Sequence, residues 1–94
     1  MSKKSTERLH ATVFGRVQGV SFRFYTRDTA NELDLTGWVT NHYDGSVEVV
    51  AEGSRSALEK LLNFLHQGPA MARVDQVQYE FCPATGEFKR FSID

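Results

Sequence analysis

The apolar residues of this chain follow two different periods along the sequence. In the segment RLHATVF, residues 8–14, Leu9, Ala11 and Val13 alternate with other residues, which is the pattern of a half-buried β-strand. Over residues 22–33, apolar and small residues recur every three or four positions, as one face of an α-helix requires. The sequence therefore predicts a strand and then a helix, joined by a short loop.

Both patterns return in the rest of the chain. Residues 36–41 and 46–53 alternate again, and the Asp44-Gly45 pair between them is typical of a tight turn, so this part is predicted to be a β-hairpin. A second helix is predicted after the hairpin, because four leucines fall at the spacing i, i+3, i+4, i+7: Leu58, Leu61, Leu62 and Leu65.

Two further segments, residues 74–81 and 88–93, are predicted to be the last strands. The order β-α-β-β-α-β, with a short extra C-terminal strand, predicts an α+β fold of the ferredoxin-like type, in which two helices cover one face of an antiparallel sheet. A chain of 94 residues fits one domain, which is predicted over residues 8–94. Residues 1–7 are polar after the initial methionine and are predicted to be a flexible tail.

Composition and charge narrow the possible functions. Eleven Lys and Arg residues against twelve Asp and Glu residues give a net charge of -1, which argues against nucleic acid or an anionic membrane as a partner. The sequence has no apolar run of a transmembrane helix and no hydrophobic region of a secretory signal near its start. Cys82 is the single cysteine, and His10 and His66 have no clustered ligands, so neither a disulfide nor a metal site is expected. These features predict a cytoplasmic protein, and a monomer is the simplest expectation.

The predicted topology brings two polar segments together. The first and second strands run parallel with the third between them, so the loop 15–21 and Asn41 should lie roughly 10 Å apart at one edge of the sheet. A loop that enters a helix N-terminus presents unpaired N–H groups and partial positive charge, which suits an anion. Gly15 and Gly19 allow close backbone approach, and Arg23 can grip two phosphoryl oxygens. On the loop alone, an anion site and an ordinary turn remain equally open.

Two segments carry a resemblance to a known family. GRVQGVSFR at residues 15–23 and GWVTNHYDGSVEVVAEG at residues 37–53 closely resemble the two signature segments of the acylphosphatase family. The pairs GP and V..V within residues 68–77, and F.I at residues 91–93, fit the C-terminal half of that family. The resemblance covers nearly the whole chain from Leu9 onward.

The resemblance implies a ferredoxin-like fold and hydrolysis of the carboxyl–phosphate bond of small-molecule acyl phosphates without a cofactor or metal. It implies that Arg23 binds the phosphoryl group and that Asn41 positions the attacking water. It also implies a phosphate-binding loop that acts mainly through its backbone, made of Gly15, Arg16, Val17, Gln18, Gly19 and Val20. Asp34 departs from the family, because many members have glycine at the end of the first helix; this should cost a little stability.

The chemistry agrees with these assignments. An acyl phosphate releases a carboxylate, whose conjugate acid has a pKa near 4, so the leaving oxygen needs no general acid. The main task is then to hold the phosphoryl group and to align a water. The Asn41 amide can orient that water, while the proton of the water passes to a phosphoryl oxygen. The alternative is a non-catalytic ferredoxin-like module that binds carbamoyl phosphate or another phosphorylated ligand.

Other residues near these segments receive less specific predictions. Ser21 is expected to cap the first helix rather than to touch phosphate, and Arg16 is equally compatible with attracting an anionic substrate or with simple solvation. Phe22 and Trp38 are predicted to fill the core beside the site. His42 is expected to be exposed in the hairpin turn and not to act as a base.

Overall fold

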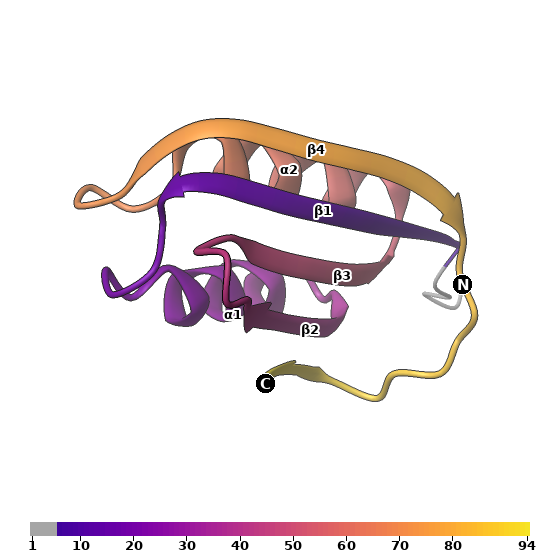
Figure 1. Cartoon of the computed structure of the whole chain (residues 1–94). Coiled ribbons are helices and arrows are strands. Elements are labelled where there is room, and N and C mark those ends of the chain that lie inside the picture. Colours follow the sequence, from indigo (N-terminus) through magenta and orange to yellow (C-terminus); the bar gives the residue numbers. More distant parts are fainter. Residues whose placement is uncertain (1–5) are drawn as a thin grey trace.

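The computed structural model describes residues 6–94, which contain five strands and two helices in two layers (Figure 1). All predicted elements are present in the predicted order. Their bounds are β1 (Glu7–Arg16), α1 (Phe22–Glu32), β2 (Thr36–Asn41), β3 (Val47–Gly53), α2 (Arg55–Gln67), β4 (Arg73–Pro83) and β5 (Phe91–Ile93). Residues 1–5 of the predicted tail lie outside the described residues. The Thr6 N–H donates a hydrogen bond to the Gly53 backbone oxygen, and Glu7 is the first residue of β1.

The strands form one sheet in the order β4-β1-β3-β2-β5. The four longer strands pair antiparallel with one another, so β1 and β2 run parallel on either side of β3, as predicted. The short extra strand β5, for which no direction was predicted, pairs parallel to β2. Figure 1 shows the reason: after β4 the chain crosses the end of the sheet and returns in the direction of β2.

One face of the sheet and the two helices enclose the hydrophobic core. On β1 the predicted alternation is observed, because Leu9, Ala11 and Val13 are buried while the residues between them are partly exposed. On α2 the four predicted leucines are all buried, and Ser54 caps the helix by accepting a hydrogen bond from the Ala57 N–H at 3.2 Å. Both helices therefore pack on the same face of the sheet, as Figure 1 shows.

Of the two residues that were predicted to fill the core beside the site, one does so and the other does not. Phe22 is buried, with 1% of its surface exposed, which confirms its prediction. The prediction for Trp38 is wrong: this side chain is half-buried on the open face of the sheet, opposite Val50 in the pairing of β2 with β3. Successive residues of a strand point to opposite faces, and Val39 takes the core position.

A buried carboxylate fixes the segment that leads to β5. Glu52 is fully buried and accepts hydrogen bonds from Arg8 Nε at 2.8 Å, from the N–H groups of Thr85 at 2.9 Å and Gly86 at 3.0 Å, and from Thr85 Oγ1 at 3.1 Å. Burial raises the pKa of Glu52, but the hydrogen bonds from Thr85, Arg8 and Gly86 outweigh it and hold this pKa below its usual value. The Glu52 carboxylate therefore anchors the crossover between β4 and β5.

Candidate active site

Two glycines, Gly15 near the end of β1 and Gly19 in the loop before α1, are needed for different reasons. Gly15 has φ 134° and lies against β4, where an added Cβ would fall 2.2 Å from the Arg73 carbonyl oxygen. Gly19 has φ 76° with open space around it, so only its backbone conformation requires glycine. Gly15 therefore allows close packing of β1 on β4, and Gly19 allows the loop to turn.

The loop is held at both of its sides. Val17 is buried, with 1% of its surface exposed, and fixes the loop to the core. Gln18 Nε2 donates to the backbone oxygens of His42 at 2.7 Å and Ser46 at 2.9 Å, which ties the loop to the turn between β2 and β3. Sequence reasoning missed this role of the Gln18 side chain, because its partners lie 24 and 28 residues away and only the strand order brings them close.

The prediction that Ser21 caps α1 with its side chain is wrong. Ser21 is the N-cap residue, but it has φ 63° and its hydroxyl makes no capping hydrogen bond. An N-cap side chain reaches the helix N–H groups from an extended backbone, and the left-handed conformation turns it elsewhere. Its carbonyl oxygen still accepts a bond from the Tyr25 N–H at 3.1 Å.

A cavity of about 230 Å³ opens where the loop, α1 and β2 meet. It is lined by eight residues: Val17, Gln18, Gly19, Ser21, Phe22, Arg23, Phe24 and Asn41. The structure thus brings together five of the predicted site residues. Gly15, Arg16 and Val20 do not line this cavity; Arg16 is the exposed last residue of β1, and Val20 lines a neighbouring cavity.

Arg23 lies in the first turn of α1 with its guanidinium available for a ligand. Its Nη1 donates a long hydrogen bond of 3.4 Å to the backbone oxygen of Asp94, which follows β5. Among residues 6–94, no Asp or Glu side chain forms an ion pair with Arg23. A solvated guanidinium beside a helix N-terminus can form two parallel hydrogen bonds to a phosphoryl group.

Asn41 is the last residue of β2 and is paired with Val47 of β3. Its Oδ1 is buried and has no hydrogen-bond partner among the described residues. A buried amide oxygen without a partner is costly, and such groups in native proteins normally bind a water or a ligand. Asn41 therefore lines the cavity with a side-chain amide whose oxygen none of the described residues engages.

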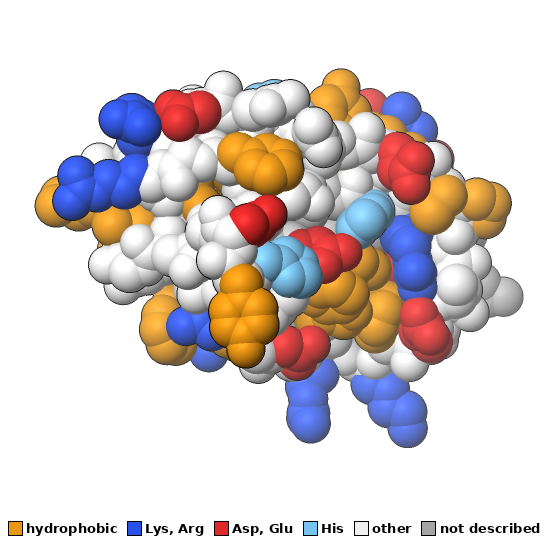
Figure 2. Space-filling model, in the orientation of Figure 1, with side chains coloured by type: hydrophobic (Ala, Val, Ile, Leu, Met, Phe, Trp, Pro, Cys, Tyr) orange, Lys and Arg blue, Asp and Glu red, His pale blue; other side chains and the backbone are white. Residues whose placement is uncertain are grey.

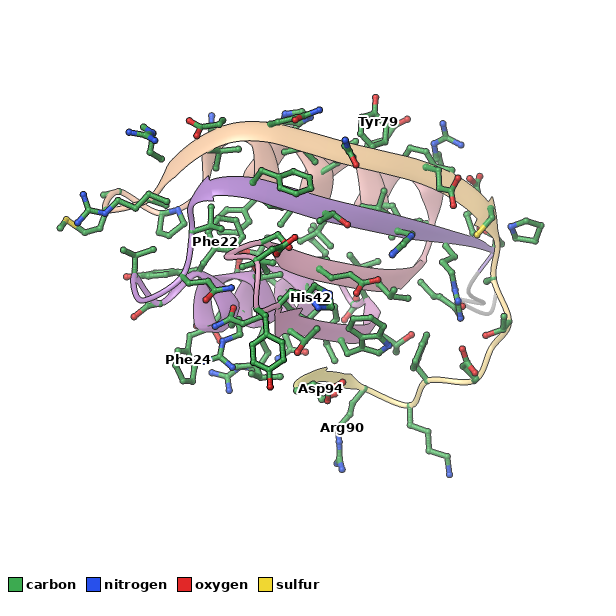
Figure 3. The ribbon with its side chains drawn as sticks, in the orientation of Figure 1. Phe22, Phe24, His42, Tyr79, Arg90 and Asp94 are labelled. Atoms are coloured by element: carbon green, nitrogen blue, oxygen red, sulfur yellow. The ribbon has the colours of Figure 1, made fainter. Side chains whose placement is uncertain are left out.

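His42, the next residue, points toward the open face of the sheet (Figure 3). Its Nε2 bonds to Glu48 Oε1 at 2.6 Å, and the other oxygen of the same carboxylate bonds to His10. Figure 2 shows histidine side chains beside acidic side chains on this face, where positive and negative side chains are interspersed. Burial raises the pKa of Glu48, but the bonds with His10 and His42 lower it by more. His42 is thus engaged with Glu48 and lies outside the lining of the cavity.

Comparison with known proteins agrees with this geometry. The family model Acylphosphatase matches residues 9–93. An acylphosphatase of Pelotomaculum thermopropionicum is 51% identical over 89 residues, which cover 95% of this chain and 97% of the relative, and one of Salinibacter ruber is 45% identical over 99% of this chain and 98% of the relative. The crystal structure of acylphosphatase from Bacillus subtilis superposes with a TM-score of 0.90 and 34% identity, covering 94% of this chain and 98% of that one.

The predicted ferredoxin-like fold and the predicted family are both confirmed by these matches, since the relatives and this chain cover almost all of each other. The relatives are named as acylphosphatases, which are hydrolases. Taken with a cavity that joins the two signature segments, the comparisons establish that this chain belongs to the acylphosphatase family.

Proposed function

We propose that Arg23 and the loop hold the phosphoryl group of an acyl phosphate in the cavity and that Asn41 directs a water at it. The observation that carries this proposal is that Arg23 of α1, loop residues 17–19 and Asn41 of β2 all line one cavity. The reaction is hydrolysis of the carboxyl–phosphate bond, and the substrates are small-molecule acyl phosphates.

The phosphoryl group is held by groups that are already in place. The N–H groups of the loop and of the first turn of α1 lie at a helix N-terminus, which carries partial positive charge. The conformation of the loop depends on Gly19. Arg23 adds a full charge and a planar pair of donors. Gln18 contributes by holding the loop against the β2–β3 turn, which keeps the position of the loop fixed relative to Asn41.

The water step needs only orientation. The Asn41 amide holds the water by a hydrogen bond, so that a lone pair of the water points at phosphorus. A bond forms between the water oxygen and phosphorus, while the bond from phosphorus to the acyl oxygen breaks and its electron pair leaves with the carboxylate. The proton of the water passes to a phosphoryl oxygen. The weakly basic carboxylate leaves without protonation, so we expect no metal or cofactor requirement.

The direct test is release of inorganic phosphate from acetyl phosphate and benzoyl phosphate by the purified chain in the presence of EDTA. We expect turnover with both substrates. If the chain binds phosphate but releases none from either substrate, the non-catalytic module that binds carbamoyl phosphate or another phosphorylated ligand becomes the better interpretation.

We also propose that residues 8–94 act as one monomeric domain in the cytoplasm. One continuous core supports the single domain, and the free thiol of the half-buried Cys82 is compatible with a reducing compartment. Among residues 6–94, neither helix is long and apolar enough to cross a membrane. Sedimentation equilibrium tests the oligomeric state, and a concentration-dependent mass would contradict the monomer.

A further inference from the structure

The Glu48 carboxylate, on the open face of the sheet, binds two histidines from different elements. Its Oε1 bonds to Nε2 of His42, in the turn after β2, at 2.6 Å, and its Oε2 bonds to Nε2 of His10 on β1. The Glu48 side chain is only 22% exposed, so water screens these bonds less than it would at a fully exposed position. One carboxylate of β3 therefore holds both β1 and the turn between β2 and β3.

His42 also connects to the candidate active site, because it directly follows Asn41. Its backbone closes the turn: the His42 N–H donates to the Ser46 oxygen at 2.9 Å, and the His42 oxygen accepts from the Gly45 N–H at 3.1 Å. Gln18 Nε2 donates to the same two oxygens, at 2.7 Å to His42 and at 2.9 Å to Ser46. The bond between His42 and Glu48 therefore fixes a turn to which the loop between β1 and α1 is bound.

His10 binds the same carboxylate from within a strand rather than from the turn. It lies opposite Val50 of β3 and Glu80 of β4, so strands on both sides hold its backbone. Among residues 6–94, its side chain forms a hydrogen bond with Glu48 alone. Loss of the bond to His10 leaves the turn attached to Glu48, whereas loss of the bond to His42 releases the turn.

We propose that Glu48 is a positioning residue for the hydrolysis, that it acts through His42 to hold Asn41 in place against the loop, and that this hold tightens when His42 is protonated. This inference rests on the proposed function, because it assumes that Asn41 directs the attacking water. A misplacement of about 1 Å caused by a distant substitution can cost about a hundredfold in rate. A looser turn should therefore lower kcat more than the affinity for the phosphoryl group, which Arg23 holds from α1.

The dependence on protonation follows from the chemistry of the pair. Histidine gains its charge as pH falls from about 8 to about 5, and a positive charge on the donor strengthens its hydrogen bond to a carboxylate. Burial raises the pKa of Glu48, but its bonds with His10 and His42 lower it by more, so the carboxylate stays ionised over this range. A neutral imidazole still donates one N–H, so the bond persists at high pH in a weaker form.

Other ionisable groups lie around these three side chains, and a test of pH must hold their contribution constant. In the turn, Asp44 accepts from the Ser46 N–H at 2.9 Å, and its pKa is lowered mainly by hydrogen bonds from Ser46 and to a smaller extent by His42. Further ionisable groups near the cluster are Tyr43 in the same turn, Asp94 after β5, and Arg8, Glu52 and Glu80 on the same face of the sheet. All of them are the same in the wild type and in the variants, so a ratio of rates at one pH cancels their effect.

The test is the ratio of kcat for the wild type to kcat for Glu48→Gln, measured with benzoyl phosphate in the full chain. We expect this ratio to be about five- to tenfold near pH 5.5 and about twofold near pH 8, with KM within about twofold. His42→Gln keeps an N–H donor that cannot be protonated, so its kcat should match the wild type near pH 8 and fall about fivefold below it near pH 5.5. The matched control is His10→Gln, which breaks the other bond of the same carboxylate and should leave kcat unchanged at both pH values.

A ratio for Glu48→Gln that stays the same at both pH values would overturn the inference, as would an equal loss in His10→Gln. Release of no phosphate by the wild type would instead overturn the proposed hydrolysis. Hydrogen exchange tests the hold on the turn without turnover. Near pH 5.5 the Gly45 N–H, which bonds to the His42 oxygen, should exchange about three- to tenfold faster in Glu48→Gln than in the wild type or His10→Gln. Equal exchange of this N–H in the wild type and Glu48→Gln would contradict the positioning role even in an inactive protein.

Discussion

Two buried polar groups lie at opposite ends of the sheet, at the end of β2 and at the end of β3, and their surroundings differ. The Glu52 carboxylate accepts four hydrogen bonds, from Arg8 Nε, from the Gly86 N–H, and from the N–H and the hydroxyl of Thr85. Asn41 Oδ1 is buried as well and has no partner among the described residues. One group is fully satisfied by the protein, whereas no described residue engages the other.

Under the proposed function, Asn41 acts in the reaction, whereas Glu52 holds the structure together. A satisfied buried carboxylate holds distant segments together, and it is costly to remove because its donors are then left unpaired. An unsatisfied buried oxygen adds nothing to folding, so its removal should cost activity and not stability. Substitutions at the two ends should therefore give opposite phenotypes.

The largest effect is expected at the functional end from Arg23→Ala. We expect kcat/KM for benzoyl phosphate to fall by on the order of 10³-fold, because the charge that holds the phosphoryl group is lost in both the ground state and the transition state. Inhibition by inorganic phosphate should disappear as well. The control is Arg27→Ala, one turn later on α1, whose guanidinium pairs with the exposed Asp28; a similar loss there would show that the effect is not specific to the site.

At the structural end, Glu52→Ala should lower the free energy of unfolding by about 3 kcal/mol, because it leaves Arg8 and two backbone N–H groups without their acceptor. Urea denaturation followed by circular dichroism measures this. Glu59→Ala is the control, since Glu59 is exposed on α2 in an ion pair with Arg55 and should contribute less than about 1 kcal/mol. Equal stabilities of the two variants would refute the anchoring role of Glu52.

Asn41→Ala should give the reverse result. We expect kcat to fall by on the order of a hundredfold or more while the affinity for inorganic phosphate stays within about twofold. The free energy of unfolding should not decrease, because the substitution removes a buried oxygen that has no partner in the structure. Wild-type turnover in Asn41→Ala would sink the water-positioning role, and Asn63→Ala on the exposed face of α2 supplies the control.

A smaller effect is expected when pH is varied. The pKa of Glu52 is lower in the folded state than in the unfolded chain, so its stabilising contribution is fully present above the unfolded pKa and is lost as pH falls through the folded pKa. We therefore expect stability to decline more steeply below pH 4.5 in the wild type than in Glu52→Gln. Glu48, whose pKa is also lowered, is present in both proteins and cancels in the comparison. Parallel pH profiles would contradict the assignment.

The two ends also differ in how far the sequence predicts them. Arg23 and Asn41 were predictable because the β-α-β-β order places the loop after β1 and the end of β2 at one edge, and the resemblance then assigned their roles. The partners of Glu52 were not, since Arg8 and Thr85 lie 44 and 33 residues away and nothing in an alternating strand marks which carboxylate will be covered. Local patterns predict elements and topology, whereas side-chain partners depend on register between distant strands.

Trp38 and Ser21 show the same limit at single positions. The period of two along β2 placed Trp38 and Val39 on opposite faces, but it did not say which face the helices cover. The helix start at Phe22 was predicted, but the left-handed backbone of Ser21, which prevents the cap, depends on how the loop closes around the cavity. The residue types thus predicted where α1 begins, but they did not predict whether the Ser21 side chain caps it.

The smallest predicted effect uses Ser21 and Asp34, which lie on either side of α1 and are the non-glycine residues with positive φ among residues 6–94. Ser21 has φ 63° and Asp34 has φ 59°, a conformation that strains residues with a Cβ. Glycine relieves the strain but adds freedom to the unfolded chain, so Ser21→Gly and Asp34→Gly should each raise the free energy of unfolding by only about 0.5 kcal/mol. Because they lie at opposite ends of an 11-residue helix, the double variant should show the sum in urea denaturation. Destabilisation by Ser21→Gly alone would mean that its hydroxyl holds the loop, and the functional end would then contain a structural group of its own.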